Sequence, residues 1–391
     1  MRFSSPPVPS TASPPARYAS PPTNKAPFSR PTWAEIDVSA LRHNVALLAQ
    51  LAAPAQVLAV LKANAYGHGT GIVAPVLDAL PEVAMLGVAS VDEGFALREL
   101  GIQKPILLLS AMLPEEARSA VRARLTPTIW TRELGLALQQ AAKLEQTRAD
   151  FHFKLDTGMG RLGALAPEAK RDFKSLLALD RLDLRGVYTH LSCADEPDDE
   201  LSALQLQRFG AFLEEVEPAP GVLRHAANSA ASIRYPRARF DMVRPGIALY
   251  GSNPWPEKDL DLKPVMTWKA RVTNLKTVPR GATVSYGATW RAPKTTRLAV
   301  VSCGYADGFR RSLGERAHVV INGEKCPVVG RVTMDQIMVD TGEAPVHLGD
   351  EATLFGRELP VEEMAAWAQT ISYEILCGVS SRVPRLPVSS V

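Results

Sequence analysis

Residues 57–69 read VLAVLKANAYGHG, and the expected fold rests on the pattern in this stretch. A short apolar run closes on one lysine, Lys62, and Gly67 and Gly69 follow it. An apolar run of this length is typical of a strand buried on both faces of a parallel sheet. The glycines allow the backbone to turn tightly where the strand ends.

From Trp33 to about residue 260, short apolar runs of this kind alternate with amphipathic helical patterns. The expected strands are Val57–Lys62, Met85–Ala89, Ile106–Leu109, Leu125–Ile129, Phe151–Leu155, Leu184–Thr189, Leu223–Ala226 and Met242–Pro245. The expected helices include Leu41–Leu51, Val91–Leu100, Glu115–Arg122 and Leu204–Val216. Eight strand–helix units in roughly 230 residues favour a (β/α)8 barrel of the TIM type over an open doubly wound sheet.

Beyond residue 263 the pattern changes to strands with few helices between them. The expected strands are Met266–Lys276, Arg297–Ser302, Ala317–Ile321, Cys326–Val332 and Ile337–Asp340. Asn322-Gly323 joins two β-branched runs and predicts a hairpin, because both residues tolerate positive φ. The sequence therefore predicts an α/β fold in three parts: a disordered Pro/Ser-rich leader (1–31), the barrel (32–262) and a C-terminal mainly-β domain (263–391).

Composition excludes several classes of protein. The 391 residues carry a net charge of +3 with both signs interspersed, so we expect neither nucleic acid nor a membrane as partner. The four cysteines are far apart and form no CxxC motif, which indicates reduced thiols and no metal site. The leader lacks the apolar segment of a signal peptide, so the expected location is the cytoplasm.

Polar side chains gather at one end of the predicted barrel. Each closes or follows a strand: Lys62 the first, Lys154 and Arg161 the fifth, His190 the sixth, Asn228 and Ser229 the seventh, and Arg244 the eighth. Barrel enzymes build their active sites from the loops at the carboxyl ends of the strands. The sequence therefore predicts an enzyme with its site at this face.

Two features together indicate a cofactor. A lysine at the end of a buried strand is partly desolvated, which favours its neutral amine and hence Schiff-base formation, although a lone lysine there is more often structural. The loops HAANSAA (225–231) and RPGIALYG (244–251) follow the strands beside which barrels usually bind phosphate, and Ser229, Gly246 and Ile247 supply donors. A Schiff-base lysine combined with a phosphate site describes a pocket for pyridoxal 5′-phosphate.

Seven motifs resemble those of the alanine racemases in order and spacing. They are VLKANAYGHG (60–69), KLDTGMGRLG (154–163), THLS (189–192), NSA (228–230), RPGIALYG (244–251), VSYGATW (284–290) and GRVTMDQIMVD (330–340). The resemblance covers about residues 33–386. It implies a pyridoxal-phosphate-dependent isomerase that interconverts L- and D-alanine, for peptidoglycan supply or for alanine catabolism.

The resemblance assigns two catalytic bases. Lys62 carries the cofactor and acts on one face of the substrate, and Tyr286 acts on the other, because racemisation needs a base on each side of a planar carbanion. Arg244 resembles the arginine that faces the pyridine nitrogen. An arginine does not take the ring proton, so the cofactor withdraws electrons less strongly than beside an acid.

The resemblance also assigns the remaining site residues: Tyr66, His190, Ser229, Gly246 and Ile247 to the cofactor, and Arg161, Met334 and Asp335 to the substrate. Lys154 resembles a lysine that family members often carry as a carbamate, although an ordinary ion pair explains it equally well. Because Tyr286 and Met334 come from the β domain, the resemblance implies a homodimer whose active sites are shared between subunits.

One departure and three alternatives stand beside this reading. Many family members have a phosphate-binding tyrosine just before RVPR or two residues after it, where this chain has Ser381 and Pro387; a serine hydroxyl could still reach the phosphate. A broad-specificity or serine racemase of the same fold stays open, since a small pocket rejects an added hydroxyl only weakly. Arg244 disfavours a decarboxylase, and a non-enzymatic carrier of the cofactor would lack the β domain.

Overall fold

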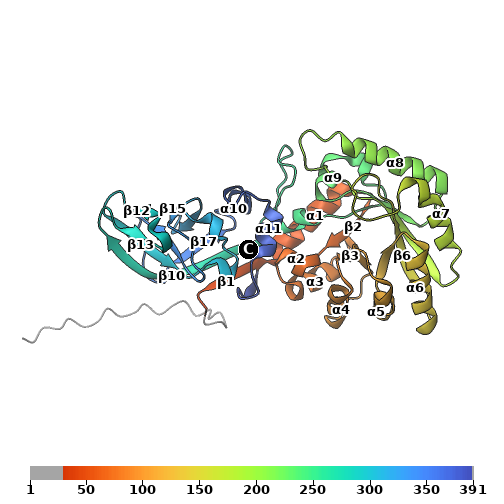
Figure 1. The fold of residues 1–391 in the computed structure, drawn as a ribbon, viewed down its shortest axis with the longest axis horizontal. Helices are drawn as coiled ribbons and strands as arrows, with labels where there is room; N and C mark the ends of the chain where they lie inside the picture. Colours follow the sequence, from red (N-terminus) through yellow and green to blue (C-terminus); the bar gives the residue numbers. More distant parts are fainter. Residues whose placement is uncertain (1–29, 390–391) are drawn as a thin grey trace, which may run out of the picture.

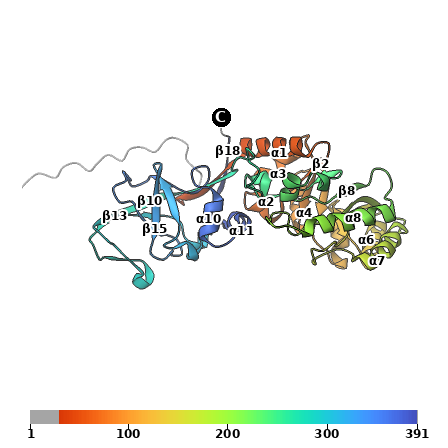
Figure 2. The same ribbon diagram turned by 90° about the horizontal axis from the view of Figure 1, so that it is seen from above.

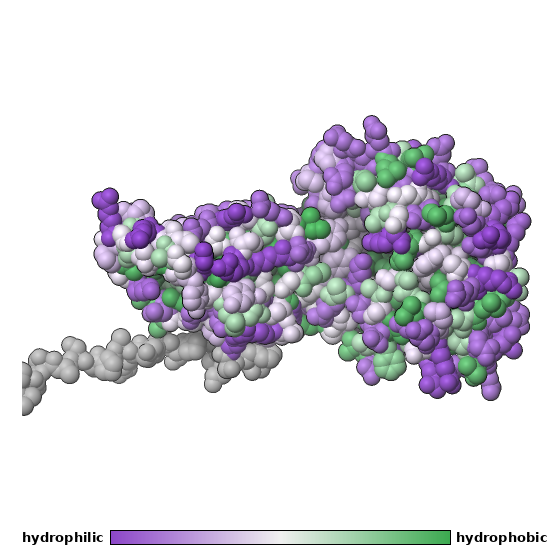
Figure 3. All heavy atoms as spheres, in the orientation of Figure 1, coloured by the Kyte–Doolittle hydropathy of each residue, from purple (hydrophilic) through white to green (hydrophobic). Residues whose placement is uncertain are grey.

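The computed structural model describes residues 30–389, which form two lobes side by side (Figure 1). One lobe is an α/β barrel and the other consists mainly of strands, so the expected fold class is confirmed. Hydrophilic side chains are spread over both lobes (Figure 3). The leader expected to be disordered lies outside the described residues, apart from Arg30 and Pro31.

Within the described chain, the barrel lobe has the eight parallel strands that the sequence predicted. They are β2 (Gln56–Val60), β3 (Val83–Val88), β4 (Ile106–Leu108), β5 (Thr126–Ile129), β6 (Ala149–Lys154), β7 (Leu182–Tyr188), β8 (Leu223–His225) and β9 (Met242–Val243). Hydrogen-bonded neighbours follow the order β8-β7-β6-β5-β4-β3-β2-β9. The ring closes where the N–H groups of Asp241 and Arg244 donate to the carbonyls of Arg224 and Ala227, at 3.0 and 2.9 Å.

Helices surround this barrel (Figures 1 and 2). They are α1 (Val38–Ala52), α3 (Thr70–Ala79), α4 (Val91–Glu99), α5 (Ala117–Arg122), α6 (Arg132–Leu144), α7 (Ala166–Leu177), α8 (Leu201–Val216) and α9 (Ser229–Arg234). In α6, the Thr131 hydroxyl accepts from the Leu134 N–H at the first turn, and Leu138, Ala141 and Ala142 form the buried stripe. No helix within residues 30–389 is long and apolar enough to cross a membrane.

The second lobe is a strongly curved sheet with two helices beside it. Its strands are β1 (Thr32–Asp37), β10 (Met266–Val278), β13 (Thr296–Val301), β14 (His318–Ile321), β15 (Glu324–Val329), β16 (Ile337–Asp340), β17 (Glu351–Phe355) and β18 (Arg385–Val388), with a separate hairpin of β11 (Thr283–Val284) and β12 (Trp290–Arg291). The helices are α10 (Val361–Trp367) and α11 (Ser372–Gly378). The sheet order is β13-β16-β15-β14-β17-β10-β1-β18, and β13 also pairs with β10.

The first strand of the chain corrects the expected domain boundary. Residues 32–37 were assigned to the barrel, but β1 pairs antiparallel with β10 and parallel with β18, so it belongs to the β lobe. Its partners lie more than 200 residues away in the sequence, which local patterns do not reveal. The predicted hairpin is confirmed: Asn322 and Gly323, with φ of 51° and 81°, join β14 to β15.

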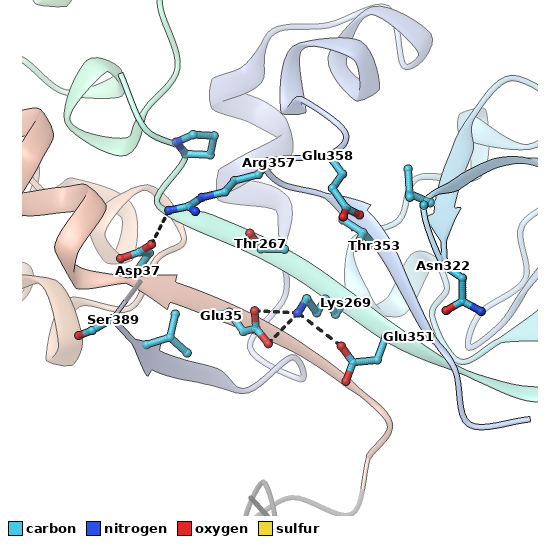
Figure 4. Close-up of a pocket in the computed structure, with 14 residues that line it drawn as sticks. Glu35, Asp37, Thr267, Lys269, Asn322, Glu351, Thr353, Arg357, Glu358 and Ser389 are labelled. Carbon is cyan, nitrogen blue, oxygen red and sulfur yellow. Dashed lines mark hydrogen bonds and ion pairs between the residues drawn. The ribbon is translucent and has the colours of Figure 1, made fainter. Parts of the chain in front are cut away.

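Ion pairs cross the sheet of the β lobe in a groove of about 490 Å³ (Figure 4). Lys269 on β10 lies between Glu35 on β1 and Glu351 on β17, with Nζ–oxygen distances of 3.0 and 3.4 Å. The lysine charge is thus balanced by carboxylates on both neighbouring strands, and these pairs stabilise the sheet.

The two lobes meet through buried polar contacts. Asn44 of α1 is fully buried, and its amide nitrogen donates to the carbonyls of Leu249 and Lys263 at 3.0 and 2.8 Å. Its amide oxygen accepts from the Lys263 N–H at 2.8 Å. Asn44 therefore fixes the path by which the chain leaves the barrel for the β lobe.

Candidate active site

A cavity of about 370 Å³ lies at the carboxyl ends of the barrel strands. Nine of the residues predicted for the site line it: Lys62, Tyr66, Lys154, Arg161, His190, Ser229, Arg244, Gly246 and Ile247. Two lysines and two arginines are among them, and no carboxylate of the described chain lines the cavity. A low-dielectric hollow that contains basic side chains and no carboxylate favours an anionic ligand.

Lys62 opens a short turn, labelled α2 (Lys62–Tyr66), that is wound in the opposite sense to an ordinary helix. Ala63, Asn64 and Ala65 have φ of 54°, 54° and 55°, and Tyr66 has φ of 52°. This left-handed conformation costs roughly 1–2 kcal/mol for each L-residue. Such strain persists where the surrounding structure enforces it, most often at functional sites.

Contacts from distant segments enforce the turn. The Glu93 carboxylate accepts from the N–H groups of Ala63 and Ala89, each at 2.7 Å, and so joins the turn to the end of β3. Arg385 of β18 donates from Nε to the Gly67 carbonyl at 2.9 Å. The β lobe therefore helps to hold the lysine in place.

The cations of the cavity shift one another's pKa values. Burial lowers the pKa of Lys62, and Arg161 lowers it further. Burial lowers the pKa of Lys154 to about 7, with smaller contributions from Arg244 and Arg161. Both shifts favour the neutral amine, which is the form that acts as a base or a nucleophile.

Arg244 is buried at the centre of the barrel mouth. Its Nη2 donates to the carbonyls of Thr189 and Ala226 at 2.8 and 3.0 Å, and its Nη1 donates to Nδ1 of His225 at 2.8 Å. Burial lowers the pKa of Arg244 to about 10, so the guanidinium keeps its charge at neutral pH. Nη2 also lies 3.4 Å from Nδ1 of His190.

This arginine sets the tautomers of a row of histidines. Because Nδ1 of His225 accepts from Arg244, His225 carries its proton on Nε2 and donates to Nδ1 of His152 at 2.9 Å. Burial and the arginine charge hold the pKa values of His190 and His225 well below their usual range. Both imidazoles are therefore neutral. By the same reasoning as for His225, His190 carries its proton on Nε2.

Tyr188 completes this arrangement. Its ring centroid lies 5.1 Å from Nζ of Lys154 and 5.0 Å from Cζ of Arg244. The negative faces of an aromatic ring favour such cations. Its hydroxyl lies 2.8 Å from the Thr128 hydroxyl, and burial raises the pKa of Tyr188 to about 12. Tyr188 lies in one of the strands expected from the sequence, but no sequence motif gave it a role in the site.

Two of the predicted phosphate donors, Ser229 and Gly246, are in direct contact where they line the cavity. Ser229 Oγ accepts from the Gly246 N–H at 2.8 Å and lies 3.4 Å from the Ala248 nitrogen. A Cβ at Gly246 would lie 2.3 Å from the Tyr66 hydroxyl oxygen, so only glycine permits this approach. Ser229 is the first helical residue of α9, and Asn228 is its N-cap, with Oδ1 accepting from the Ala231 N–H at 3.0 Å.

Three predicted site residues lie outside the cavity. Tyr286 and Met334 are 72% and 53% exposed, and Asp335 is exposed beside Met334. Tyr286 lies between β11 and β12, and β12 is at the end of the β lobe far from the barrel (Figure 1). Within one chain, therefore, Tyr286 does not reach Lys62.

The exposed residues nevertheless form one group. Next to Tyr286, the Ser285 hydroxyl donates to the Arg331 carbonyl at 2.6 Å, which ties its turn to the loop before Met334. Arg382 donates to the Asp335 carboxylate at 2.7 Å and fixes the end of that loop. The structure thus contains two separate groups of predicted site residues, one in the barrel mouth and one on the β lobe.

The cavity also contains residues from α11 that the sequence analysis missed. Tyr373 and Cys377, four residues apart on this helix, line it together with the barrel residues. Ser381, where a phosphate contact was considered from the resemblance, is exposed and does not line the cavity. Among residues 30–389, no group of three or more potential ligands is placed to hold a metal ion.

Comparison with known proteins accounts for both lobes. The model of the alanine racemase N-terminal domain matches residues 36–254, and that of the C-terminal domain matches residues 265–387. The chain belongs to the alanine racemase family. The alanine racemase of Symbiobacterium thermophilum is 45% identical over 371 residues, which cover 91% of this chain and 97% of that protein. That of Carboxydothermus hydrogenoformans is 45% identical over 370 residues, covering 92% and 100%.

Solved structures of alanine racemases superpose on the whole architecture. That of Clostridium difficile 630 has a TM-score of 0.87 at 36% identity and covers 93% of this chain and 97% of its own. That of a D-cycloserine-producing Streptomyces lavendulae has a TM-score of 0.87 at 35% identity and covers 93% and 98%. The two-lobed arrangement is therefore that of the alanine racemase family.

The pKa of Lys154 predicts how pH affects stability. Because this pKa falls from 10.5 to about 7 on folding, the unfolded chain binds more protons between these values, and folding becomes more favourable as pH rises through this window. Below about pH 7 Lys154 is protonated in both the folded and the unfolded state, so the folded state bears the full free-energy cost of burying its charge. Urea unfolding of the cofactor-free protein in carbonate-free buffer should show Lys154→Met gaining stability over wild type at pH 7, by an amount on the order of a few kcal/mol.

This gain should shrink as pH rises to 9.5. The matched control is Lys170→Met, which removes a surface lysine paired with Glu215 at 2.8 Å and should show no such trend. A gain for Lys154→Met that stays constant with pH would contradict the lowered pKa.

Proposed function

We propose that this protein is an alanine racemase, an isomerase that interconverts L- and D-alanine with pyridoxal 5′-phosphate. The observation that carries the proposal is the barrel cavity, which joins a desolvated lysine to backbone and hydroxyl donors and contains basic side chains without a carboxylate. Both the phosphate of this cofactor and the carboxylate of alanine are anions. The names of its close relatives support the same activity.

The residues of the cavity fit pyridoxal phosphate. Lys62 would hold it covalently, Ser229, Gly246 and Ile247 would bind its phosphate, and Arg244 would face its pyridine nitrogen. When bound to an amino acid, this cofactor withdraws electrons from the Cα–H bond and makes that proton acidic. Because Arg244 stays protonated at neutral pH, it would donate to the ring nitrogen without protonating it, which would limit electron withdrawal and disfavour side reactions.

Two bases on opposite faces of Cα would carry the proton transfers. The lowered pKa of Lys62 makes its amine available near neutral pH on one face. Tyr286 would act on the other face, with His190 donating from Nε2 to the tyrosine oxygen and stabilising its deprotonated form. Arg161 would bind the substrate carboxylate, assisted by the backbone N–H of Met334 in the loop that also contains Asp335.

The separation of the two groups supports a homodimer with shared sites. Tyr286 and Met334 lie exposed on the β lobe, whereas Lys62 lies in the barrel mouth. A two-fold arrangement would place the β lobe of each chain over the barrel of the other and give two equivalent complete sites. The free cysteines support a reducing compartment such as the cytoplasm.

We also propose that Lys154 carries a carbamate. Its neighbours Arg244, Arg161 and Lys62 disfavour an ammonium group, and the lowered pKa supplies the neutral amine. The amine nitrogen would form a bond to the carbon of carbon dioxide and release one proton to solvent. The anion that results would attract Arg161 rather than repel it.

The activity itself is tested with single amino acids. Chiral chromatography of L-alanine, L-serine and larger amino acids should show the fastest interconversion for alanine, slower turnover of serine, and none for bulky side chains. Borohydride reduction should attach the cofactor irreversibly to the peptide that contains Lys62. A label on the Lys154 peptide would contradict the assignment of Lys62 as the cofactor-binding lysine. Faster turnover of serine than of alanine would identify a serine racemase instead.

The carbamate is tested by isotope labelling. Protein equilibrated with 13C-bicarbonate should give one additional protected 13C resonance, which Lys154→Met removes and the surface variant Lys170→Met keeps. If wild type shows no resonance that depends on Lys154, the side chain is an ordinary amine.

Shared sites are tested by mixing two inactive variants. Lys62→Ala and Tyr286→Phe should each be nearly inactive, and after unfolding, equal mixing and refolding about half of the dimers should contain one chain of each. One site in such a dimer carries both defects and the other carries neither, so activity should return to roughly a quarter of wild type. Different affinity tags on the two chains verify that mixed dimers form. If they form and remain inactive, both bases come from the same chain.

A further inference from the structure

Four charged side chains form an ion-pair network on the β lobe, beside the loop that contains Met334. Arg30 Nη2 lies 2.6 Å from Oδ2 of Asp307 and 3.8 Å from Oδ1 of Asp335. Arg382 Nη2 lies 2.7 Å from Oδ1 of Asp335, and its Nε lies 3.8 Å from Oδ1 of Asp307. Arg30 falls in the stretch that was expected to be a disordered leader, so no sequence motif connected it with a site.

Asp307 is the buried member of this network. Its side chain has no exposed surface, whereas that of Asp335 is 53% exposed. Its Oδ2 accepts from the Gly304 N–H at 3.0 Å, and its own N–H donates to the Gly304 carbonyl at 3.0 Å, so Asp307 closes a tight turn. Its Oδ1 has no hydrogen-bond partner among the residues that the structure describes. A buried carboxylate is costly unless a cation balances it, and Arg30 makes the shorter of its two ion pairs.

This turn fixes the backbone of the loop that contains Met334. The Tyr305 N–H donates to the Thr333 carbonyl at 3.0 Å. The Ala306 N–H donates to the Met334 carbonyl, also at 3.0 Å. A Cβ at Gly304 would lie 2.4 Å from the Met334 carbonyl carbon, so the turn and the loop are in direct backbone contact. The conformation of the loop therefore depends on that of the turn.

The hydrogen bond from Tyr305 determines the direction of the Met334 N–H. In a planar trans peptide the carbonyl and the N–H point in opposite directions. Because the Thr333 carbonyl points toward the Tyr305 nitrogen, the N–H of Met334 in the same peptide points away from it. Within residues 30–389 this N–H has no hydrogen-bond partner. It is therefore a free donor whose direction depends on the turn that Asp307 closes.

We propose that Arg30 and Asp307 act together as positioning residues, which hold the Met334 N–H in the direction that binds the substrate carboxylate. This inference rests on the proposed function, because the substrate would lie in the barrel of a second chain. Neither side chain would touch the substrate. The charge of Arg30 balances the buried carboxylate of Asp307, and the turn that Asp307 closes orients the loop. Loss of the Arg30 charge would therefore weaken substrate binding while both catalytic bases remain in place.

The test separates substrate binding from catalytic rate. Arg30→Ala should raise KM for L- and D-alanine roughly tenfold while kcat changes less than about twofold, because a hydrogen bond made equally in the ground and transition states affects binding alone. Arg30→Lys keeps the charge and should keep KM close to that of wild type. The matched control is Arg185→Ala, which removes an exposed barrel arginine paired with Asp150 at 2.8 Å and should leave both parameters unchanged.

A double-mutant cycle tests the route through Asp307. Asp307→Asn removes the charge but keeps an oxygen that can accept from the Gly304 N–H, so Arg30→Ala should raise KM far less in this background than in wild type. Hydrogen exchange of the purified protein gives a measurement that does not depend on activity. The amides of Tyr305 and Ala306 should exchange about tenfold faster in Arg30→Ala than in wild type, followed by mass spectrometry of the peptides that contain them.

The outcomes separate this inference from the proposed function. An unchanged KM in Arg30→Ala overturns the inference whether or not kcat falls, and so does unchanged exchange. An equal rise of KM in the wild-type and Asp307→Asn backgrounds overturns it as well, because Arg30 would then act by another route. Failure of wild type to racemise alanine would instead overturn the proposed function, and the exchange measurement would still decide whether Arg30 holds the turn. Circular dichroism verifies the fold of each variant, and Arg30→Gln carries the same prediction if Arg30→Ala does not fold.

Discussion

A buried guanidinium holds the barrel mouth together. Arg244 follows the last barrel strand and donates to the Thr189 and Ala226 carbonyls and to His225, which follow or end the two preceding strands. An unpaired charge in this position would cost several kcal/mol, so these loops are constrained to offer acceptors to it. Closure of the sheet between β8 and β9 occurs at the same place, which links the barrel's integrity to the arrangement of its site.

The charge of this arginine also determines the chemistry of its neighbours. It adds to the effect of burial in lowering the pKa of Lys154, and Arg161 lowers the pKa values of both Lys154 and Lys62. Burial and the charge of Arg244 together keep His190 and His225 neutral. A cavity with excess positive charge and neutral bases suits a ligand that brings its own negative charge. The phosphate and the substrate carboxylate would supply this negative charge. The same positive charges that favour anion binding therefore also keep the bases in their neutral form.

The β lobe serves the barrel in two ways. Through α11 and Arg385 it holds the left-handed turn that begins at Lys62, and it contributes Tyr373 to the cavity of its own chain. Its far end exposes Tyr286 and Met334, which fit no function in a single chain. The β lobe thus supports the cavity of its own chain and could complete the cavity of a second chain. A barrel without this lobe would lack both contributions.

The sequence by itself determined the eight barrel strands, the order of the two lobes and the loops that carry most of the cavity residues. It did so because buried parallel strands need continuous apolar runs, and because polar residues after such strands must meet at one end of the barrel. The Asn322-Gly323 hairpin could also be predicted from the sequence, because both turn residues tolerate positive φ.

Only the tertiary structure decided the rest. Strand β1 joins the β lobe because its partners are β10 and β18, far away in the chain. The left-handed turn at Ala63–Tyr66 contradicts the local preference of its residues and exists because Glu93 and Arg385 hold it. Tyr188 and Tyr373 enter the cavity through packing between segments that share no sequence motif. Local preferences act over a few residues, whereas these features depend on contacts between residues that meet only after the chain has folded.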